Sequence, residues 1–95
     1  MTIREDGARL ILEGPLTVAS VSKLAETGSG LVASADRTID LAAVSQVDSA
    51  ALALLLSWSR AARRAGRKLS IDGAPAALVS LASLYGVDSI LPLGR

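Results

Sequence analysis

The sequence contains no cysteine, no histidine and no phenylalanine in 95 residues. Without cysteine, disulfides and thiolate chemistry are excluded, and the redox compartment stays open. Without histidine, the commonest general base and the commonest neutral metal ligand are missing. A serine nucleophile therefore lacks its usual base, and no spacing supports a Ser-Lys pair with Lys23 or Lys68. The aspartates follow no calcium-loop pattern. We expect no metal, no cofactor and no enzymatic activity.

Aromatic residues and long apolar runs are also scarce. Trp58 and Tyr85 are the two aromatic residues, although 51% of the chain is hydrophobic, so a core of Leu, Val, Ile and Ala is expected. The longest apolar run is 50–56, far short of the roughly 20 residues that span a bilayer. The N-terminal residues show no apolar signal region behind a basic stretch. We therefore expect a single cytoplasmic domain, 1–95, that does not insert directly into a membrane.

The net charge is only +1, but it is unevenly distributed. Residues 1–58 contain four basic and seven acidic groups, whereas residues 59–95 contain six basic and two acidic groups. Much of this asymmetry is a basic cluster at the end of a predicted helix. It is interpreted either as a solvated cap that complements the helix dipole or as a surface for an acidic partner, and nucleic acid is not expected without nearby stacking aromatics. The cluster consists of Arg60, Arg63, Arg64, Arg67 and Lys68.

Turn residues and hydrophobic periodicity divide the chain into alternating strands and helices. Asp6-Gly7 between two strand-like runs predicts a hairpin, Gly14-Pro15 is expected to end the second strand, and 27–30 to end the first helix. Strands are predicted over 2–5, 8–13, 37–41, 68–71 and 89–93, and helices over 18–26, 49–65 and 76–85. The segment 42–47 is interpreted as a bridge, and 31–35 is left open between helix and loop. The order predicts an α/β fold (α+β in looser usage): a mixed sheet of four to five strands with crossover helices.

The segment 44–56, V-S-Q-V-D-S-A-A-L-A-L-L-L, combines a strand end with a helix start. Asp48 is the natural N-cap, which places the Ser49 hydroxyl in the first helical turn. Unpaired N–H groups and the positive end of the helix dipole favour an anion there. Ser49 is therefore interpreted as a second capping hydroxyl, as a phosphoacceptor, or as a residue that a partner protein contacts.

The same helix carries two apolar stripes. One faces the predicted sheet, and the other contains Ala51, Leu54 and Trp58. This second stripe has two interpretations. In the first, a neighbouring helix covers it, and the last helix is the expected candidate. In the second, it forms a partner surface with Trp58 as its anchor. In the second case it also offers a surface through which the isolated protein dimerises.

The order of elements and the segment I-D-L-A-A-V-S-Q-V-D-S-A-A-L-A-L-L-L, 39–56, resemble the STAS domain family. The resemblance implies the STAS fold over essentially the whole chain. In the anti-sigma factor antagonists of this family, a kinase phosphorylates the second residue after the Asp in an Asp-Ser-Ser-Gly-like step. Here that position is Ala50, Ala51 replaces the glycine, and Ser49 is the only hydroxyl residue left as an acceptor.

The chain is more similar to the MlaB branch of the family. The matching features are Asp48, Ser49 and the small residues Ala50 and Ala51, the following L-A-L-L-L, the run A-x-x-A-G-R-K-L and the closing L-x-x-L-Y-G…I-L-P. This resemblance implies a non-catalytic cytoplasmic subunit, peripheral at the inner membrane, that binds an MlaF-like ABC ATPase. MlaE-like permease and MlaD-like substrate-binding subunits complete such a complex, which transports phospholipid and maintains lipid asymmetry. The partner-binding residues expected from the stripe and the resemblance together are Asp48, Ser49, Ala50, Ala51, Leu54 and Trp58.

Overall fold

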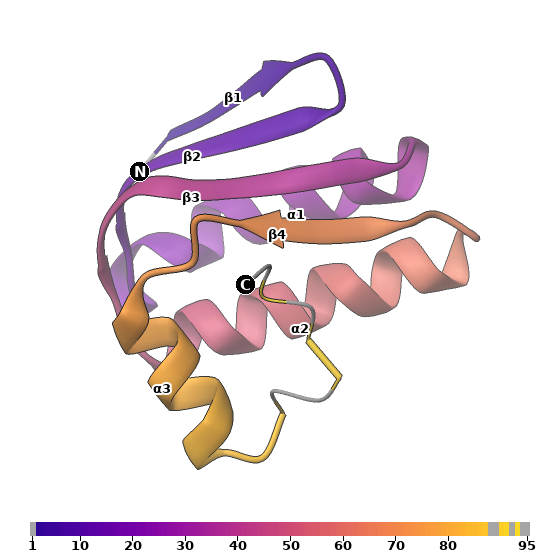
Figure 1. The fold of residues 1–95 in the computed structure, drawn as a ribbon. Helices are drawn as coiled ribbons and strands as arrows, with labels where there is room; N and C mark the ends of the chain where they lie inside the picture. The colour runs from indigo at the N-terminus through magenta and orange to yellow at the C-terminus, as the bar shows by residue number, and fades with distance from the viewer. Residues whose placement is uncertain (1, 88–89, 92, 94–95) are drawn as a thin grey trace.

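The computed structural model describes residues 2–87, 90–91 and 93, which form a four-stranded mixed sheet with three helices (Figure 1). The predicted α/β class is therefore confirmed. In chain order the elements are β1 (Thr2–Asp6), β2 (Arg9–Leu16), α1 (Val18–Ser34), β3 (Arg37–Val47), α2 (Ser49–Arg64), β4 (Leu69–Asp72) and α3 (Ala76–Leu84).

The sheet begins with the predicted hairpin. Strands β1 and β2 are antiparallel, and Asp6 pairs with Arg9 across a two-residue loop. Gly7, the first loop residue, has φ of 60°. Because glycine lacks a Cβ, it adopts this left-handed conformation without steric cost. The Asp-Gly step is therefore a correct local signal for the turn.

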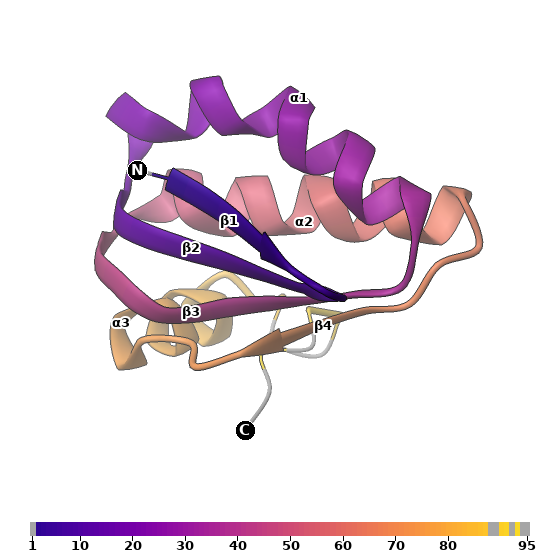
Figure 2. The same ribbon diagram turned by 90° about the horizontal axis from the view of Figure 1, so that it is seen from above.

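The remaining strands are parallel, and the order across the sheet is β1-β2-β3-β4. Helix α1 connects β2 to β3, and α2 connects β3 to β4. Each of these crossovers leads to the next strand in the same direction across the sheet. Because crossovers between parallel strands share the same handedness, both helices lie on the same face of the sheet. Figure 2 shows α1 and α2 side by side over that face, with α3 apart from them. The opposite face of the sheet carries neither of these two helices.

The core lies between the sheet and the helices, and it is built almost entirely from aliphatic side chains. Alternate residues of β2 and β3 point inward, for example Leu10, Leu12, Ile39 and Leu41, all fully buried. This period of two is the expected pattern for a sheet with one covered face. Trp58 is the largest buried side chain, and it supplies volume that the missing phenylalanines do not.

Helix α1 is longer than predicted, and the expected stop at 27–30 is wrong. The helix continues through both glycines to Ser34, so the segment left open at 31–35 forms its last turn and cap. The reason is tertiary: a Cβ built on Gly28 lies only 2.0 Å from a ring carbon of Trp58. Gly28 therefore permits close approach of α1 and α2. That packing outweighs the roughly 0.5–1 kcal/mol that a helical glycine costs relative to alanine.

Strands β2 and β3 also extend further than predicted. Gly14-Pro15 does not end β2, and the expected bridge over 42–47 is the second half of β3. The two strands remain paired to Leu16 and Val47, with register shifts between Ile11 and Glu13 and between Gly14 and Pro15. Such irregularities accommodate a proline, which lacks the N–H that a regular ladder requires.

The later elements follow the prediction more closely. Helix α2 starts at Ser49 as expected and ends at Arg64, one residue before the predicted end; strand β4 is shifted by one residue, and α3 ends at Leu84 rather than 85. In the strand expected over 89–93, Ser89 and Pro92 lie outside the described residues, and Ile90 is in a turn. Within the part of the chain that is described, no helix is both long and apolar enough to cross a membrane.

Candidate partner-binding site at the start of α2

The start of α2 lies at the edge of the sheet where parallel strands end. The carboxyl ends of β2 and β3 lie at this edge, and α1 and α2 begin directly after them. In open α/β sheets, the crevice outside the carboxyl ends of the strands is where ligands usually bind. The residues that connect strand to helix here are Thr17 and Asp48.

Asp48 joins the starts of both helices through its carboxylate. One oxygen, Oδ1, accepts a hydrogen bond from the backbone N–H of Ala50 at 2.9 Å. The other, Oδ2, accepts from the backbone N–H of Val18 at 3.0 Å. The predicted N-cap of α2 is confirmed, and the same side chain also satisfies an unpaired donor of α1. Because both oxygens are engaged, the role of Asp48 is to hold the two helix starts together.

A second hydrogen-bonded turn positions the start of α1. The Thr17 backbone N–H donates to Ser20 Oγ at 3.0 Å, and this hydroxyl lies 3.0 Å from the carbonyl oxygen of Pro15, which accepts from it. The turn leaves Val18 73% exposed beside Asp48. Sequence reasoning missed this contribution of α1. The signal was the spacing Thr17-x-x-Ser20, a relative of the capping box with serine in the place of the usual Glu or Gln.

Ser49 is the exposed member of the predicted site. It is the first residue of α2, directly after Asp48, and Ala50 beside it is half-buried. Its hydroxyl is not involved in any of the side-chain hydrogen bonds found among the described residues. Because this hydroxyl accepts no backbone N–H among the described residues, the interpretation of Ser49 as a second capping hydroxyl beside Asp48 does not hold. The hydroxyl is accessible to a partner or to a phosphate donor.

The predicted contact stripe of Ala51, Leu54 and Trp58 is wrong as an exposed surface. Ala51 and Trp58 are fully buried and Leu54 is 5% exposed. Helix α1 covers them, not the last helix: Trp58 Nε1 donates a hydrogen bond to the carbonyl oxygen of Ala25 at 3.1 Å, and its ring lies over Gly28. The second apolar stripe of α2 is therefore the α1–α2 interface, and it offers no surface for dimerisation.

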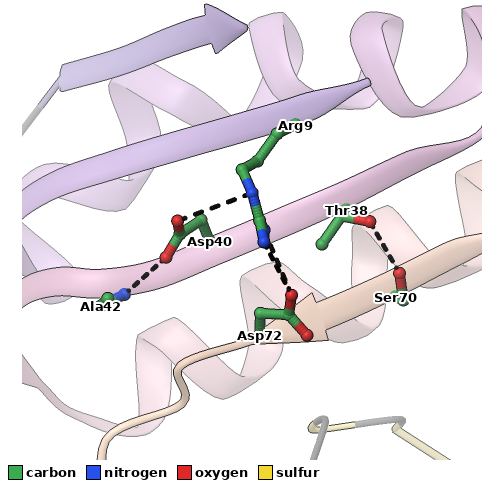
Figure 3. A network of polar contacts seen from close by, with 6 residues as sticks. All are labelled: Arg9, Thr38, Asp40, Ala42, Ser70 and Asp72. Atoms are coloured by element: carbon green, nitrogen blue, oxygen red, sulfur yellow. Dashed lines mark hydrogen bonds and ion pairs between the residues drawn. The ribbon is translucent and has the colours of Figure 1, made fainter. Parts of the chain in front are cut away.

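A further polar network lies on the opposite face of the sheet (Figure 3). Arg9 lies 3.0 Å from Asp72 and 3.9 Å from Asp40, whose carboxylate also accepts from the N–H of Ala42. These side chains pair with one another across three strands, so they stabilise the face of the sheet opposite α1 and α2. No group of three or more potential metal ligands is found in the described residues.

The site thus combines the starts of two helices with one exposed serine beside the Asp48 carboxylate. A protein-family model described as "Mlab, STAS domain" matches residues 1–92. The chain belongs to this STAS domain family. The family predicted from the motifs is therefore confirmed. No curated protein sequence matches the chain.

Solved structures are similar to this STAS domain in fold. The anti-sigma factor antagonist SpoIIAA in its unphosphorylated form has a TM-score of 0.67 at 14% identity, covering 99% of this chain and 86% of that one. A candidate anti-sigma factor antagonist from Thermotoga maritima, tm1081, has a TM-score of 0.68 at 14% identity over 99% of this chain and 85% of that one. A structure of Mglu has a TM-score of 0.62 at 18% identity over 79% of this chain, which spans only 19% of that protein.

Proposed function

We propose that this STAS domain is a non-catalytic accessory subunit that binds the cytoplasmic ATPase of an ABC phospholipid transporter. In this proposal the ATPase is MlaF-like, and permease and substrate-binding subunits complete a complex that maintains outer-membrane lipid asymmetry. The observation that carries the proposal is the exposed Ser49, placed beside a carboxylate whose two oxygens already hold α1 and α2. Membership of the MlaB-type family supports the choice of partner.

The geometry at this edge suits a protein contact. Asp48 fixes the relative position of two helix starts, so Val18, Ser49 and Ala50 are presented by rigid elements. A preorganised surface loses little conformational entropy when a partner binds. Val18 supplies an exposed apolar side chain and Ser49 a polar one, which is the mixed chemistry of a non-obligate interface.

Co-purification with a co-expressed MlaF-like ABC ATPase tests the proposal. We expect the wild-type domain to retain the ATPase and Ser49→Arg to release it, because a long cation replaces a small hydroxyl in a packed contact. Thr27→Arg is the matched control, since Thr27 is exposed on α1 well away from its start. It should bind like wild type. Retention of the ATPase by Ser49→Arg, with an unchanged ATPase rate, would contradict the proposal.

A second candidate function is that of an anti-sigma factor antagonist regulated by phosphorylation of Ser49. The exposed hydroxyl in the first turn of α2 favours it, because a helix start stabilises added negative charge. The neighbouring Asp48 carboxylate opposes that charge, and Ala50 occupies the position where the antagonists carry their acceptor. Mass spectrometry after incubation with a cognate anti-sigma kinase decides the question. Phosphate on Ser49 supports this function, and an unmodified chain excludes it.

A further inference from the structure

The solvent-facing side of α2 changes character along its length. At 100° per residue, Ser49, Ala53 and Ser57 lie in line with Arg60 and Arg64, and all five are exposed. The N-terminal half of this side is therefore small and flat, and the C-terminal half is cationic. The helix spans about 24 Å at 1.5 Å per residue, so Ser49 and the arginines lie on one face at opposite ends.

Four arginines form a stripe at the cationic end. Arg60, Arg63 and Arg64 follow the spacing i, i+3, i+4, which places them on one side of the helix. Arg67 comes two residues after the C-cap of α2, Ala65. All four are exposed. The ion pairs found among the described residues involve Arg4, Arg9 and Arg37, and none involves this arginine stripe.

A favourable interaction with the helix dipole accounts for the positions of only some of these arginines. Arg63 and Arg64 lie in the last turn of α2, where a cation interacts favourably with the dipole. Arg60 lies a turn earlier, and Arg67 follows Gly66, whose φ of 71° marks the end of the helix. The dipole effect falls off within the last turn. A solvated cap therefore does not account for Arg60 or Arg67.

We propose that the arginine stripe binds an acidic segment of the same protein partner that contacts Ser49, with carboxylates at helical spacing. This inference rests on the proposed function and names the chemistry of the partner's surface. Arginine favours carboxylates because its planar guanidinium donates two parallel hydrogen bonds to them. Since both ends of one helix face take part, the partner lies along the whole of α2.

The surroundings of the stripe favour a protein partner over a bilayer or nucleic acid. The large hydrophobic side chains exposed among the described residues are Val18, Leu84, Tyr85 and Ile90, and none belongs to α2. The stripe therefore lacks the apolar groups with which amphipathic surfaces enter a membrane. Trp58 is fully buried, so α2 also offers no exposed aromatic ring on which a base could stack.

Charge reversal tests the inference on the co-purified complex. We expect Arg60→Glu combined with Arg64→Glu to weaken ATPase binding roughly tenfold or more at low ionic strength, with a smaller effect in high salt. The control is Lys23→Glu, which makes the same kind of change at an exposed position on α1. Ala25 and Gly28 lie on the side of α1 that packs against Trp58. At 100° per residue, Lys23 lies on the opposite side of α1. It should bind like wild type.

A zero-length cross-link identifies the partner groups. Arg64→Lys introduces an amine, which a carbodiimide condenses with a carboxylate in direct contact. We expect an isopeptide cross-link to an Asp or Glu of the ATPase, located by mass spectrometry and absent from wild type. If the ATPase binds and neither the cross-link nor the charge-reversal effect is found, the inference is overturned and the proposed function stands.

Two other results also overturn the inference. If the wild-type domain retains no ATPase, the proposed function fails and this inference fails with it. If the double charge reversal leaves ATPase binding intact but abolishes binding to vesicles of phosphatidylglycerol and phosphatidylcholine, the stripe is a membrane-contact surface instead.

Discussion

Gly28 and Trp58 decide how closely α1 and α2 approach each other. The indole ring occupies the space into which a Cβ at position 28 would project, with the nearest ring carbon at 2.0 Å. Both residues are buried. The indole N–H of Trp58 donates a hydrogen bond to the carbonyl oxygen of Ala25, which lies one turn before Gly28 in α1. A small residue on one helix thus matches the largest residue on the other.

Gly28→Ala is expected to destabilise the domain by about 1–3 kcal/mol, the usual cost of overpacking a core. The better helix propensity of alanine offsets up to about 1 kcal/mol of that cost. Urea unfolding followed by Trp58 fluorescence measures the change in the free energy of unfolding.

Gly30→Ala is the matched control, because a Cβ there meets nothing within 4 Å. It should stabilise the domain by roughly 0.5–1 kcal/mol, since the helix gains propensity without a clash. If the two alanine variants change stability equally, the close approach of Gly28 to Trp58 does not determine the packing.

At the residue scale, the sequence predicts contacts that are local in the chain and misses those that are not. The bond from Ala50 to Asp48 follows from the pattern Asp-Ser before an apolar run, and it was predicted. The bond from Val18 to the same carboxylate joins residues 30 positions apart. No local signal specifies it, because it depends on β2 and β3 ending at the same sheet edge.

At the scale of the secondary-structure elements, Arg37 at the start of β3 connects the end of α1 to the distant β1–β2 hairpin. Its guanidinium donates to the carbonyl oxygens of Leu31 in α1 and Gly7 in the β1–β2 turn, and it forms an ion pair with Glu5 at 2.9 Å. Its side chain is only 9% exposed. The contact with Leu31 satisfies one of the carbonyl groups that the end of α1 leaves unpaired.

Arg37→Ala is expected to cost about 1.5–3 kcal/mol in stability, the range for hydrogen bonds to charged groups. The control Arg4→Ala removes an exposed ion pair of 3.6 Å with Glu13 and should change stability by less than about 1 kcal/mol. Thermal and urea unfolding of both variants check this. A loss for Arg37→Ala no larger than that for Arg4→Ala would show that the three elements are held by apolar packing alone.

The errors in the predicted elements have the same origin. The sequence places the start of α2 correctly, because Asp48 and the apolar period are local signals. It ends α1 too early at its glycines, and it ends β2 too early at Gly14-Pro15. In both places a residue with poor intrinsic propensity is retained because a neighbouring element packs or pairs with it. The same limitation made Trp58 a candidate anchor, since the sequence does not reveal which helix covers it.

For the whole molecule, the family and the fold class could be predicted, whereas the division of α2 into a buried and an exposed side required the structure. The STAS-like segment 39–56 contains the start of this helix. The structure buries Ala51, Leu54 and Trp58 and exposes the side of α2 that carries Ser49 and the arginine stripe, which is the side that our proposal uses. In our proposal, the exposed side of α2 binds the partner and the buried side stabilises the fold.

The arrangement of layers also predicts unequal stability across the molecule. Strands β2 and β3 and helix α2 contribute most of the fully buried side chains, whereas α3 buries only Leu78 and Ala82. Elements with few buried apolar contacts open locally without global unfolding. We therefore expect backbone amides of α3 to exchange with deuterium faster than those of α2 and β3.

Two cavity-forming substitutions sharpen this expectation, because Leu78 and Leu55 are both fully buried. Leu78→Ala should accelerate exchange mainly within α3, since it weakens the attachment of a single peripheral helix. Leu55→Ala, in the middle of α2, should lower protection throughout the sheet and helices by about 2–5 kcal/mol, the usual cost of such a truncation. Hydrogen exchange measured by mass spectrometry on wild type and both variants distinguishes the two patterns. Equal loss of protection across the whole chain in both variants would mean that α3 unfolds only together with the sheet, as part of one cooperative unit.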